Sequence, residues 1–591
     1  GNAAGTGLGG TASSINITNN AATGTITTGN LSTQGGTLGH GGSIAVNGQN
    51  NVNVGTVTTS GGTSLTGNAG RNAGAVNINA GGNVLTGAIA SAGSAGIGTN
   101  QNGGIGGSVT LTTGTGNTIT HNNISTTGGA RTGTGVGGNG ANINVNGNSL
   151  LSANTTITAT VGTGGASSGT VNFAGTINST LPNRALTINT TAATTLNGAI
   201  GNTLALTSLT TNAGGNTAIN GGSVTTTGAQ TYNDAVSTSG NTTFATTNSN
   251  VTFANSIAAA GNTVISAGTG TVTAINAANN FNNLSVTAGS ANIRDASGIV
   301  LGATNVTGAY TLQSGGAVTQ SASVSVGGNT SLIAGANDVT LNNTLNDFNT
   351  VTITNARDVN IVDANALTIG TSAVRTLAAR TLSNNLTLGG NVTATGAGDT
   401  IVLASAANFI NTSNSILTPG SGRWLVYSNS PLLDTRGAGL LTAYDFKQYN
   451  TAYGGTVLGT GDGFIYTLAP TITATLGGTA TKTYDATTSA SIGLLSLAHI
   501  GEVDGDIVTL TPLTSANYDN IDAGTGKNVT SNPLSIASAA NGTRQVFGYT
   551  FATPATTAAV GTIDQRPITV TANPGQSKIF GAVDPLPFTL T

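Results

Sequence analysis

The sequence predicts an all-β protein, with a right-handed parallel β-helix (solenoid) over residues 1–418 followed by small β-sandwich-like domains. Three observations lead to this fold class. The composition is rich in residues that form helices poorly, a glycine-led strand unit repeats at near-constant spacing, and the repeat then shortens to the length of one β-helical coil. That short coil decides against the alternatives, a propeller or an array of β-sandwiches.

The composition excludes several classes of protein. The 591 residues include 90 glycines, about one in seven, among Thr, Val, Ile and Asn, which all have poor helix propensity. With 15 Lys and Arg spread over the chain, no basic stripe for nucleic acid can form. A net charge of -3 with 37% hydrophobic residues is atypical of disorder. The absence of cysteine excludes disulfides, thiolate metal sites and cysteine nucleophiles.

Charge and proline are distributed unevenly. Residues 1–293 carry only four charged side chains: Arg71, Arg131, Arg184 and Asp234. Pro182 stands alone before Pro419, where the other ten prolines begin. Proline cannot donate to a sheet ladder, so the proline-poor body suits continuous strand pairing and a boundary is expected near residue 419. No apolar run is long enough for a membrane-spanning helix. Because Gly1 opens directly into repeat-like sequence without an initiator Met, we expect a fragment of a longer polypeptide.

A strand unit repeats in the amino-terminal part. The segment Gly42-Ser43-Ile44-Ala45-Val46 returns from Gly74, Gly107 and Gly140 at a near-constant spacing, with a one-residue slip in the last copy. Alternation of apolar and polar residues marks a strand with one buried face. A second strand follows at a near-constant offset, and a Gly/Ser/Thr/Asn-rich loop such as 91–104 closes the unit. The second strand carries Val57, Ile89 and Ile124.

The repeat shortens downstream. Gly-Asn-Thr or Gly-Asn-Val recurs with most of the asparagines separated by one or three lengths of a shorter coil, at Asn216, Asn241, Asn262, Asn329 and Asn391. A longer match relates 281–302 to 348–370 and aligns Asp295 with Asp363. Coils of this length stack at about 4.8 Å, with Val, Ile, Leu and Ala inside and Thr and Asn outside. Recurrent asparagines would then form polar ladders.

The carboxyl-terminal third differs from the preceding sequence in its aromatic content and strand pattern. Residues 419–470 contain Trp424, the only tryptophan, and several tyrosines. This segment would either cap the rod or bind a ligand, and a cap is favoured because an open β-helix end exposes unpaired strand edges. Residues 471–565 have the pattern of a small all-β domain, and 566–591 begin a further one.

Few residues suggest catalysis. Polysaccharide-active β-helices need clustered carboxylates, whereas Asp234 is the only carboxylate in 1–293. Downstream, acidic and basic residues alternate, which we interpret as a surface ladder: Arg294, Asp295, Arg357, Asp358 and Asp363. We predict no catalytic, cofactor-binding or metal-binding residue. An ice-binding array of Thr-x-Thr, as at 110–112, is disfavoured because the coil length varies.

Metal and nucleotide motifs are weak. Four aspartates could supply oxygen ligands to Ca²⁺ but fit turn residues better: Asp504, Asp506, Asp519 and Asp522. His40, His121 and His499 lack zinc-ligand spacing and are interpreted as solvated turn residues. G-x-G-x-x-G occurs at 5–10 and 133–138, as expected by chance at this glycine content.

Three segments resemble filamentous-haemagglutinin-type large exoproteins of Gram-negative bacteria: GGSVTLTTGTGNTIT at 106–120, QTYNDAV at 230–236 and GRWLVYSNSP at 422–431. Residues 471–565 resemble the YDG-type repeat, with Ala486 where glycine is usual. The piece from Ile568 resembles the start of an MBG-type repeat, with Phe580 where tyrosine is usual.

The resemblance implies a secreted adhesin on the bacterial cell surface, exported by two-partner secretion through an outer-membrane β-barrel transporter. Its partners would be host or matrix glycans or proteins, with no enzymatic activity and no cofactor. The family provides no fixed binding motif to place on this chain. Two alternatives remain: a self-associating biofilm or surface-assembly protein, and a β-helical polysaccharide-active enzyme.

Overall fold

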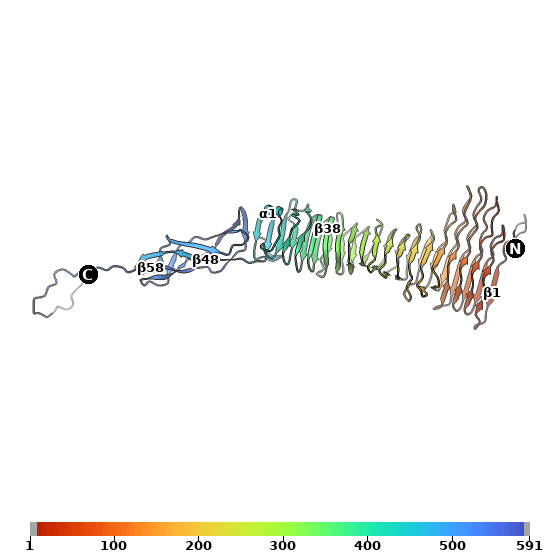
Figure 1. Cartoon of the computed structure of the whole chain (residues 1–591), viewed down its shortest axis with the longest axis horizontal. Helices are drawn as coiled ribbons and strands as arrows, with labels where there is room; N and C mark the ends of the chain where they lie inside the picture. Colours follow the sequence, from red (N-terminus) through yellow and green to blue (C-terminus); the bar gives the residue numbers. More distant parts are fainter. Residues whose placement is uncertain (1–8, 584–591) are drawn as a thin grey trace. The chain divides into compact units, whose positions relative to one another are not determined.

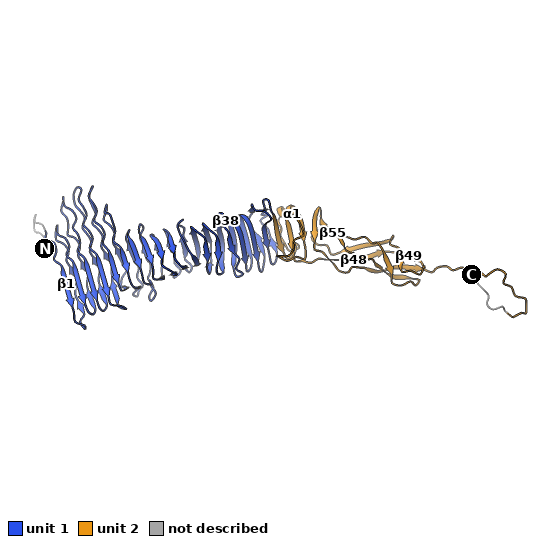
Figure 2. Cartoon of the chain, turned by 180° about the vertical axis from the view of Figure 1, so that it is seen from behind, with its two compact units in different colours: residues 1–422 blue, residues 423–591 orange. Residues whose placement is uncertain are grey.

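The structure, a computed structural model, describes residues 9–583 (Figure 1). Within them the chain is nearly all β, with strands β1 to β58 and a single short helix, α1 (Ala438–Ala443). The chain divides into two compact units, residues 1–422 and 423–591, where the sequence placed the boundary after residue 418 (Figure 2). None of the described helices has the length and apolarity that crossing a membrane requires.

Unit 1 is a parallel β-helix, as predicted. Its first face stacks β4 (Ile44–Gly48), β7 (Val76–Ala80), β10 (Val109–Thr113) and β13 (Ile143–Asn146) in parallel register. Ile44 aligns with Val76, then with Val109 and Ile143, so the predicted repeat and its one-residue slip are confirmed. These four side chains are fully buried, since each occupies an inward position of its strand.

The second predicted strand row is also present. Val57 of β6 (Val57–Thr58) aligns with Ile89 of β9 (Ile89–Ala90), which aligns with Ile124 of β12 (Ile124–Ser125). Between the two rows runs a third, in which β5 (Val52–Val54) pairs with β8 (Val84–Thr86). Each coil therefore adds one strand to each of three parallel faces.

Coils shorten along the rod, and aromatic rings then enter the core. Val251 of β26 (Val251–Phe253) aligns with Gln230 of β23 (Gln230–Tyr232), one short coil earlier. Here Tyr232, Phe244 and Phe253 pack together with ring centroids 5.0 to 5.6 Å apart. Because inward positions stack from coil to coil, large rings at successive inward positions contact one another and fill the core.

The glycine-rich loops of the early coils are ordered arms (the glycine arms, residues 91–107 and their equivalents in neighbouring coils), drawn in red and orange in Figure 1. Gly104 N–H donates to Ser94 O (2.9 Å), Gly129 N–H to Gly104 O (2.8 Å) and Gly138 N–H to Gly129 O (2.8 Å). A Cβ on Gly104 would lie 2.0 Å from the carbonyl oxygen of Arg71, so only glycine fits. This packing accounts for the motif at 133–138, whereas the motif at 5–10 lies mostly outside the described residues.

Many asparagine side chains accept hydrogen bonds from backbone N–H groups of the neighbouring coil. Asn51 Oδ1 accepts Asn83 N–H (2.8 Å), and Asn83 Oδ1 accepts Thr118 N–H (2.8 Å). A side-chain amide ladder joins Asn172, Asn197 and Asn220 at 3.1 and 2.9 Å, so such a ladder forms among asparagines other than the recurrent ones from which it was predicted. Backbone N–H groups at coil corners lie outside the regular sheet ladders and need acceptors, which the stacked amides supply.

Unit 2 begins with three parallel strands from the aromatic segment: β45 (Arg423–Ser428) pairs with β47 (Gly463–Tyr466), and β47 with β46 (Phe446–Gln448). β46 then pairs with β56 (Arg544–Phe547), which continues into the antiparallel strands β55 (Ile536–Asn541) and β52 (Ile507–Leu510). A strand from the following β domain thus covers the edge of the aromatic segment. That the segment itself caps the rod stays a prediction.

The remaining β domain packs two sheets face to face. One sheet has the order β51 (Leu495–Ile500), β48 (Thr471–Gly478), β57 (Thr550–Phe551). The other has the order β49 (Ala480–Thr483), β58 (Thr557–Asp564), β54 (Gly524–Ser531), β53 (Ala516–Tyr518), β50 (Ser489–Ala490). Leu476, Tyr518, Val529 and Ile563 form the core between them.

Two sequence features of this region can now be placed. Ala486 adopts φ 60°, a left-handed conformation that explains why glycine is usual at this position. Residues 565–583 form no strand, and 584–591 lie outside the described residues. The MBG-type interpretation of 566–591 therefore stays a prediction.

Candidate functional site

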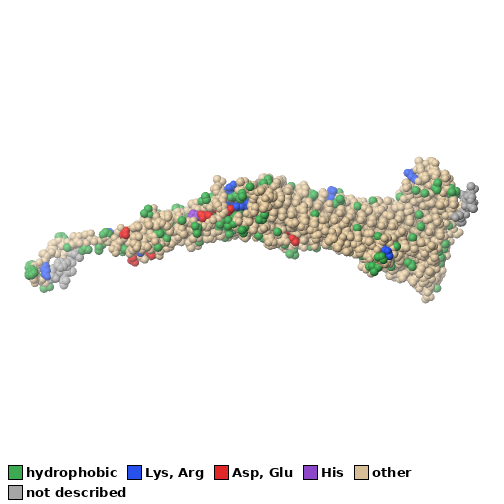
Figure 3. Space-filling view, viewed as in Figure 1, with side chains coloured by type: hydrophobic (Ala, Val, Ile, Leu, Met, Phe, Trp, Pro, Cys, Tyr) green, Lys and Arg blue, Asp and Glu red, His purple; other side chains and the backbone are tan. Residues whose placement is uncertain are grey.

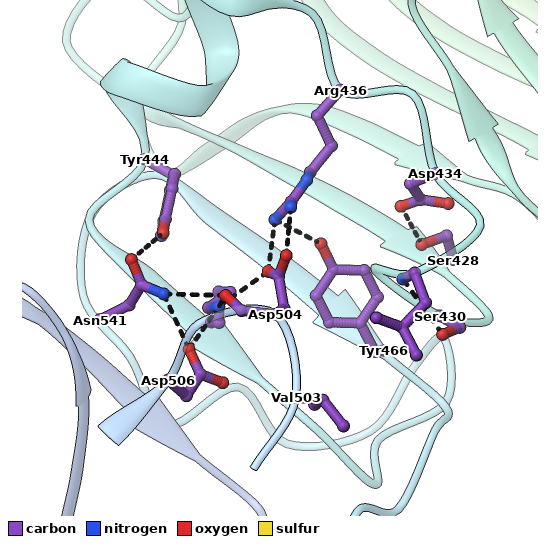
Figure 4. Close-up of polar contacts among 12 residues, drawn as sticks. Ser428, Ser430, Asp434, Arg436, Tyr444, Tyr466, Val503, Asp504, Asp506 and Asn541 are labelled. Atoms are coloured by element: carbon purple, nitrogen blue, oxygen red, sulfur yellow. Dashed lines mark hydrogen bonds and ion pairs between the residues drawn. The ribbon is translucent and has the colours of Figure 1, made fainter. Parts of the chain in front are cut away.

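Unit 2 contains a buried ion network, defined as Arg436, Lys447, Asp504 and Asp506 (Figure 4). Lys447, on β46, is fully buried; its Nζ lies 2.8 Å from Asp504 Oδ2 and also contacts the Asp506 carboxylate. Arg436 donates two hydrogen bonds to Asp504, at 2.6 and 2.8 Å. Two cations and two carboxylates thus balance each other between the aromatic segment and the turn that precedes β52.

The remaining oxygens of the network are also satisfied. Asp506 accepts hydrogen bonds from the hydroxyls of Tyr449 (2.7 Å) and Tyr549 (3.0 Å) and from Asn541 Nδ2 (3.0 Å). Burial alone would raise the pKa of Asp504, but hydrogen bonds from Arg436 and Lys447 outweigh it and lower that pKa. Burial and the nearby Asp506 carboxylate raise the pKa of Tyr449. The arrangement holds two chain segments together and presents its carboxylates to protein donors.

The structure does not bring the four candidate calcium ligands together. Asp504 and Asp506 lie in the ion network, while Asp519 lies 3.6 Å from Lys527 and Asp522 is exposed. Asp504 does lie in a turn, as predicted, with φ 54°. Across residues 9–583, no group of three His, Asp or Glu side chains is arranged to hold a metal ion. Lys447 and Asp504 are far apart in the sequence, so their ion pair left no local sequence signal.

One of the three histidines corrects a prediction. His121 is fully buried, its Nε2 lies 2.7 Å from Ser149 Oγ, and burial lowers its pKa. It takes an inward position of β11 (Thr118–His121), aligned with Leu151, so the solvated-turn interpretation is wrong there. His40 accepts the Asn72 N–H, and His499 lies 2.6 Å from Glu502.

In unit 1, Asp295 and Asp363 have equivalent structural roles. Asp295 Oδ2 accepts Phe281 N–H and Asp363 Oδ2 accepts Phe348 N–H, both at 2.6 Å. In each case Oδ1 accepts the N–H two residues further on, at 2.8 Å. The sequence alignment of the two aspartates is confirmed, but their placement in a surface ladder is wrong because both are buried. Asp234 similarly accepts Gly215 N–H (3.0 Å).

Asp363 makes a pH dependence testable. Burial raises its pKa to about 6, with a further contribution from the Asp347 carboxylate, and hydrogen bonds from Phe348 and Asn365 only partly oppose the shift. The folded state thus binds the proton more tightly than the unfolded state, so stability should rise as pH falls from 7 through 6 towards 4. We expect Asp363→Asn to remove about 1–2 kcal/mol of this rise, because the amide does not titrate.

Urea unfolding of the chain and of this variant at pH 7, 5.5 and 4.5 measures the effect, with far-UV circular dichroism reporting on the rod. Identical pH slopes for the two proteins would contradict the assignment. Asp338→Asn is the matched control, since hydrogen bonding to Arg357 lowers the pKa of Asp338 and its contribution has the opposite sign.

The predicted surface ladder is confirmed for Arg357 and Asp358. It consists of Asp338, Arg357, Asp358 and Arg375, called the charge ladder below. Arg357 binds Asp338 through Nε (2.7 Å) and Nη2 (2.5 Å) and lies 3.4 Å from Asp358, which also pairs with Arg375. Arg294 aligns instead with Gln313 of the neighbouring coil.

A groove of about 320 Å³ lies beside the charge ladder. Its exposed lining includes Ala336, Asn355, Arg357, Arg375, Thr393 and Thr395. Its floor includes the buried Ala356 and Val374, from β38 (Asp347–Asp363) and β39 (Leu367–Thr381). No sequence motif marked this groove, because its residues come from four successive coils.

Fold and sites together define a β-solenoid protein with an appended β-sandwich domain. The YDG domain family matches residues 468–559. A family described as repeats of unknown function (DUF5649) matches residues 288–355, which include Asp295 and part of the groove. No curated protein and no solved structure matches the chain.

Proposed function

We propose that this chain is part of a secreted, non-catalytic adhesin on the surface of a Gram-negative bacterium. It would be of the filamentous-haemagglutinin type and exported by two-partner secretion through an outer-membrane β-barrel transporter. The observation that carries the proposal is the combination, in one chain, of a β-solenoid with a YDG domain, a domain seen in adhesin-like proteins. The partners would be host or matrix glycans or proteins.

The surface of the rod supports this proposal. On the first face, outward positions align Asn77 with Thr110 and then with Asn144. Like charges at such positions would face one another at about 5 Å in every coil, which favours uncharged polar residues. The face in Figure 3 is accordingly mostly tan, the colour of uncharged polar side chains and backbone. Repeated weak sites of this kind can add up to firm attachment through multivalency.

The buried aspartates support a non-catalytic role. Asp295 and Asp363 direct their oxygens to backbone N–H groups inside the rod. A general acid or base must reach its substrate within hydrogen-bonding distance. These two carboxylates therefore suit coil closure better than polysaccharide cleavage.

Binding of the purified chain to arrays of glycans and matrix proteins tests the function. We expect specific binding to at least one class, with the chain remaining monomeric by analytical ultracentrifugation. Absence of all binding together with self-association would instead favour the surface-assembly alternative. Polysaccharide turnover that Asp295→Asn or Asp363→Asn abolishes would overturn the non-catalytic assignment. Export is tested separately, by loss of surface exposure when the outer-membrane transporter is deleted.

A further inference from the structure

We infer that the groove beside the charge ladder is a binding subsite for an anionic glycan, whose sugar units carry a carboxylate or a sulfate. The inference rests on the proposed function and names the ligand class for one place on the rod.

The groove arises where the backbone departs from regular stacking. β38 has 17 residues and β39 has 15, and their parallel pairing contains register shifts between Val351 and Ile353 and between Ile353 and Ala356. Small outward residues, Ala336 and Ala373, lie at the same place. A bend lined by methyl groups leaves a concavity whose volume is at the lower end of the range for small-molecule sites.

Arginines are the charged residues of the lining. Arg357 and Arg375 line the groove, and the aspartates that pair with them, Asp338 and Asp358, lie just outside the lining, so the charge ladder as a whole is neutral. Both arginine side chains are about half exposed, at 51% and 52%. A guanidinium has five N–H donors, and the pair with Asp338 uses the Nε and one Nη2 donor of Arg357. Arg375 pairs with Asp358 through Nη2. Donors thus remain on both side chains for an anionic ligand.

The arginines are also positioned before a ligand arrives. Ala356 and Val374 align in the parallel register, so Arg357 and Arg375 follow at equivalent positions one coil apart, about 4.8 Å. Their ion pairs hold the side chains in place, which reduces the entropy lost on binding. Asn355, Thr393 and Thr395 add amide and hydroxyl groups, which suit the hydroxyls of a sugar. A carboxylate or sulfate in the groove would accept charge-assisted hydrogen bonds from the N–H groups of the two arginines that their aspartates leave unused.

The test uses the whole chain and three fluorescent probes of similar length: oligogalacturonate, dextran sulfate and neutral dextran. We expect at least one anionic probe to bind more tightly than neutral dextran. Arg357→Gln/Arg375→Gln should weaken that binding at least tenfold and reduce its salt dependence. Arg294→Gln, which changes an arginine outside the groove, should leave binding within twofold.

A second variant tests the groove without changing the residues of the charge ladder. Ala336→Trp fills the groove while both arginines remain, and it should also abolish binding of the anionic probe, with an unchanged melting curve. Preference for the carboxylated or the sulfated probe would identify the anionic group. Equal affinity for neutral and anionic probes, or full binding by the double arginine variant, would overturn the inference. If the chain still bound partners on the arrays, the proposed adhesin function would stand; if it bound nothing there, that function would fail as well.

Discussion

Asp504→Asn is expected to destabilise unit 2 by about 3–5 kcal/mol, the cost of breaking a buried ion pair from one side. The substitution removes the anion that faces Arg436 and the fully buried Lys447, and leaves Asp506 as the only carboxylate of the network. One carboxylate cannot neutralise both cations, and the excess positive charge lies where water cannot solvate it, which is costly. The variant should therefore unfold at clearly lower urea concentration than the parent chain.

Trp424 makes this measurement specific. It is the only tryptophan of the chain, lies in β45 of unit 2 and is fully buried, so its fluorescence reports on the unfolding of unit 2. Asp522→Asn is the matched control, since this exposed aspartate belongs to the same β domain and should change stability by no more than about 0.5 kcal/mol. Equal urea midpoints for the two variants would show that the network contributes nothing to stability.

The ion pairs of Asp504 also predict that acid destabilises unit 2. Hydrogen bonds from Arg436 and Lys447 lower the pKa of Asp504 in the folded state. Its contribution to stability is therefore present above the unfolded pKa, near 4, and is lost as pH falls through the lower folded value. Protonation of Asp504 should therefore destabilise unit 2, whereas protonation of Asp363 should stabilise the rod.

Gly104→Val should destabilise the glycine arms by about 3 kcal/mol, the upper end of the cost of overpacking. A Cβ at this position would lie 2.0 Å from the Arg71 carbonyl oxygen, and that backbone atom cannot move aside as a flexible side chain can. The carbonyl of Gly104 also accepts the Gly129 N–H, so displacement would break the contact with the next coil. Hydrogen exchange should report faster exchange in peptides that contain Gly129 and Gly138.

Gly29→Val provides the comparison for this experiment. Gly29 also lies in an early coil, but no atom lies within 4 Å of a Cβ built on it. Its substitution should leave exchange at Gly129 and Gly138 unchanged, with a shift in thermal midpoint of at most a few degrees. Unaltered protection in Gly104→Val would mean that the arms are not held by close backbone packing.

Repetition made much of the rod predictable. An inward residue in one coil is inward in the next, so aligning Ile44 with Val76 and Val109 sufficed to predict both strand and register. The same reasoning aligned Asp295 with Asp363 correctly. It could not predict their burial, because alternating acidic and basic residues fit a solvated face equally well. The inward position of His121 was missed for a similar reason, since a single polar residue gives no periodic signal.

The sequence by itself determined the fold class, the repeat register, the match between the two buried aspartates and the change in composition near residue 419. These features depend on local periodicity, which each coil repeats. Only the tertiary structure decided the rest: the close packing of the glycine arms, the ion network that joins Lys447 to Asp504, and the groove between Arg357 and Arg375. Each of these depends on which backbone segments approach one another, and a small register shift can create or remove such an approach.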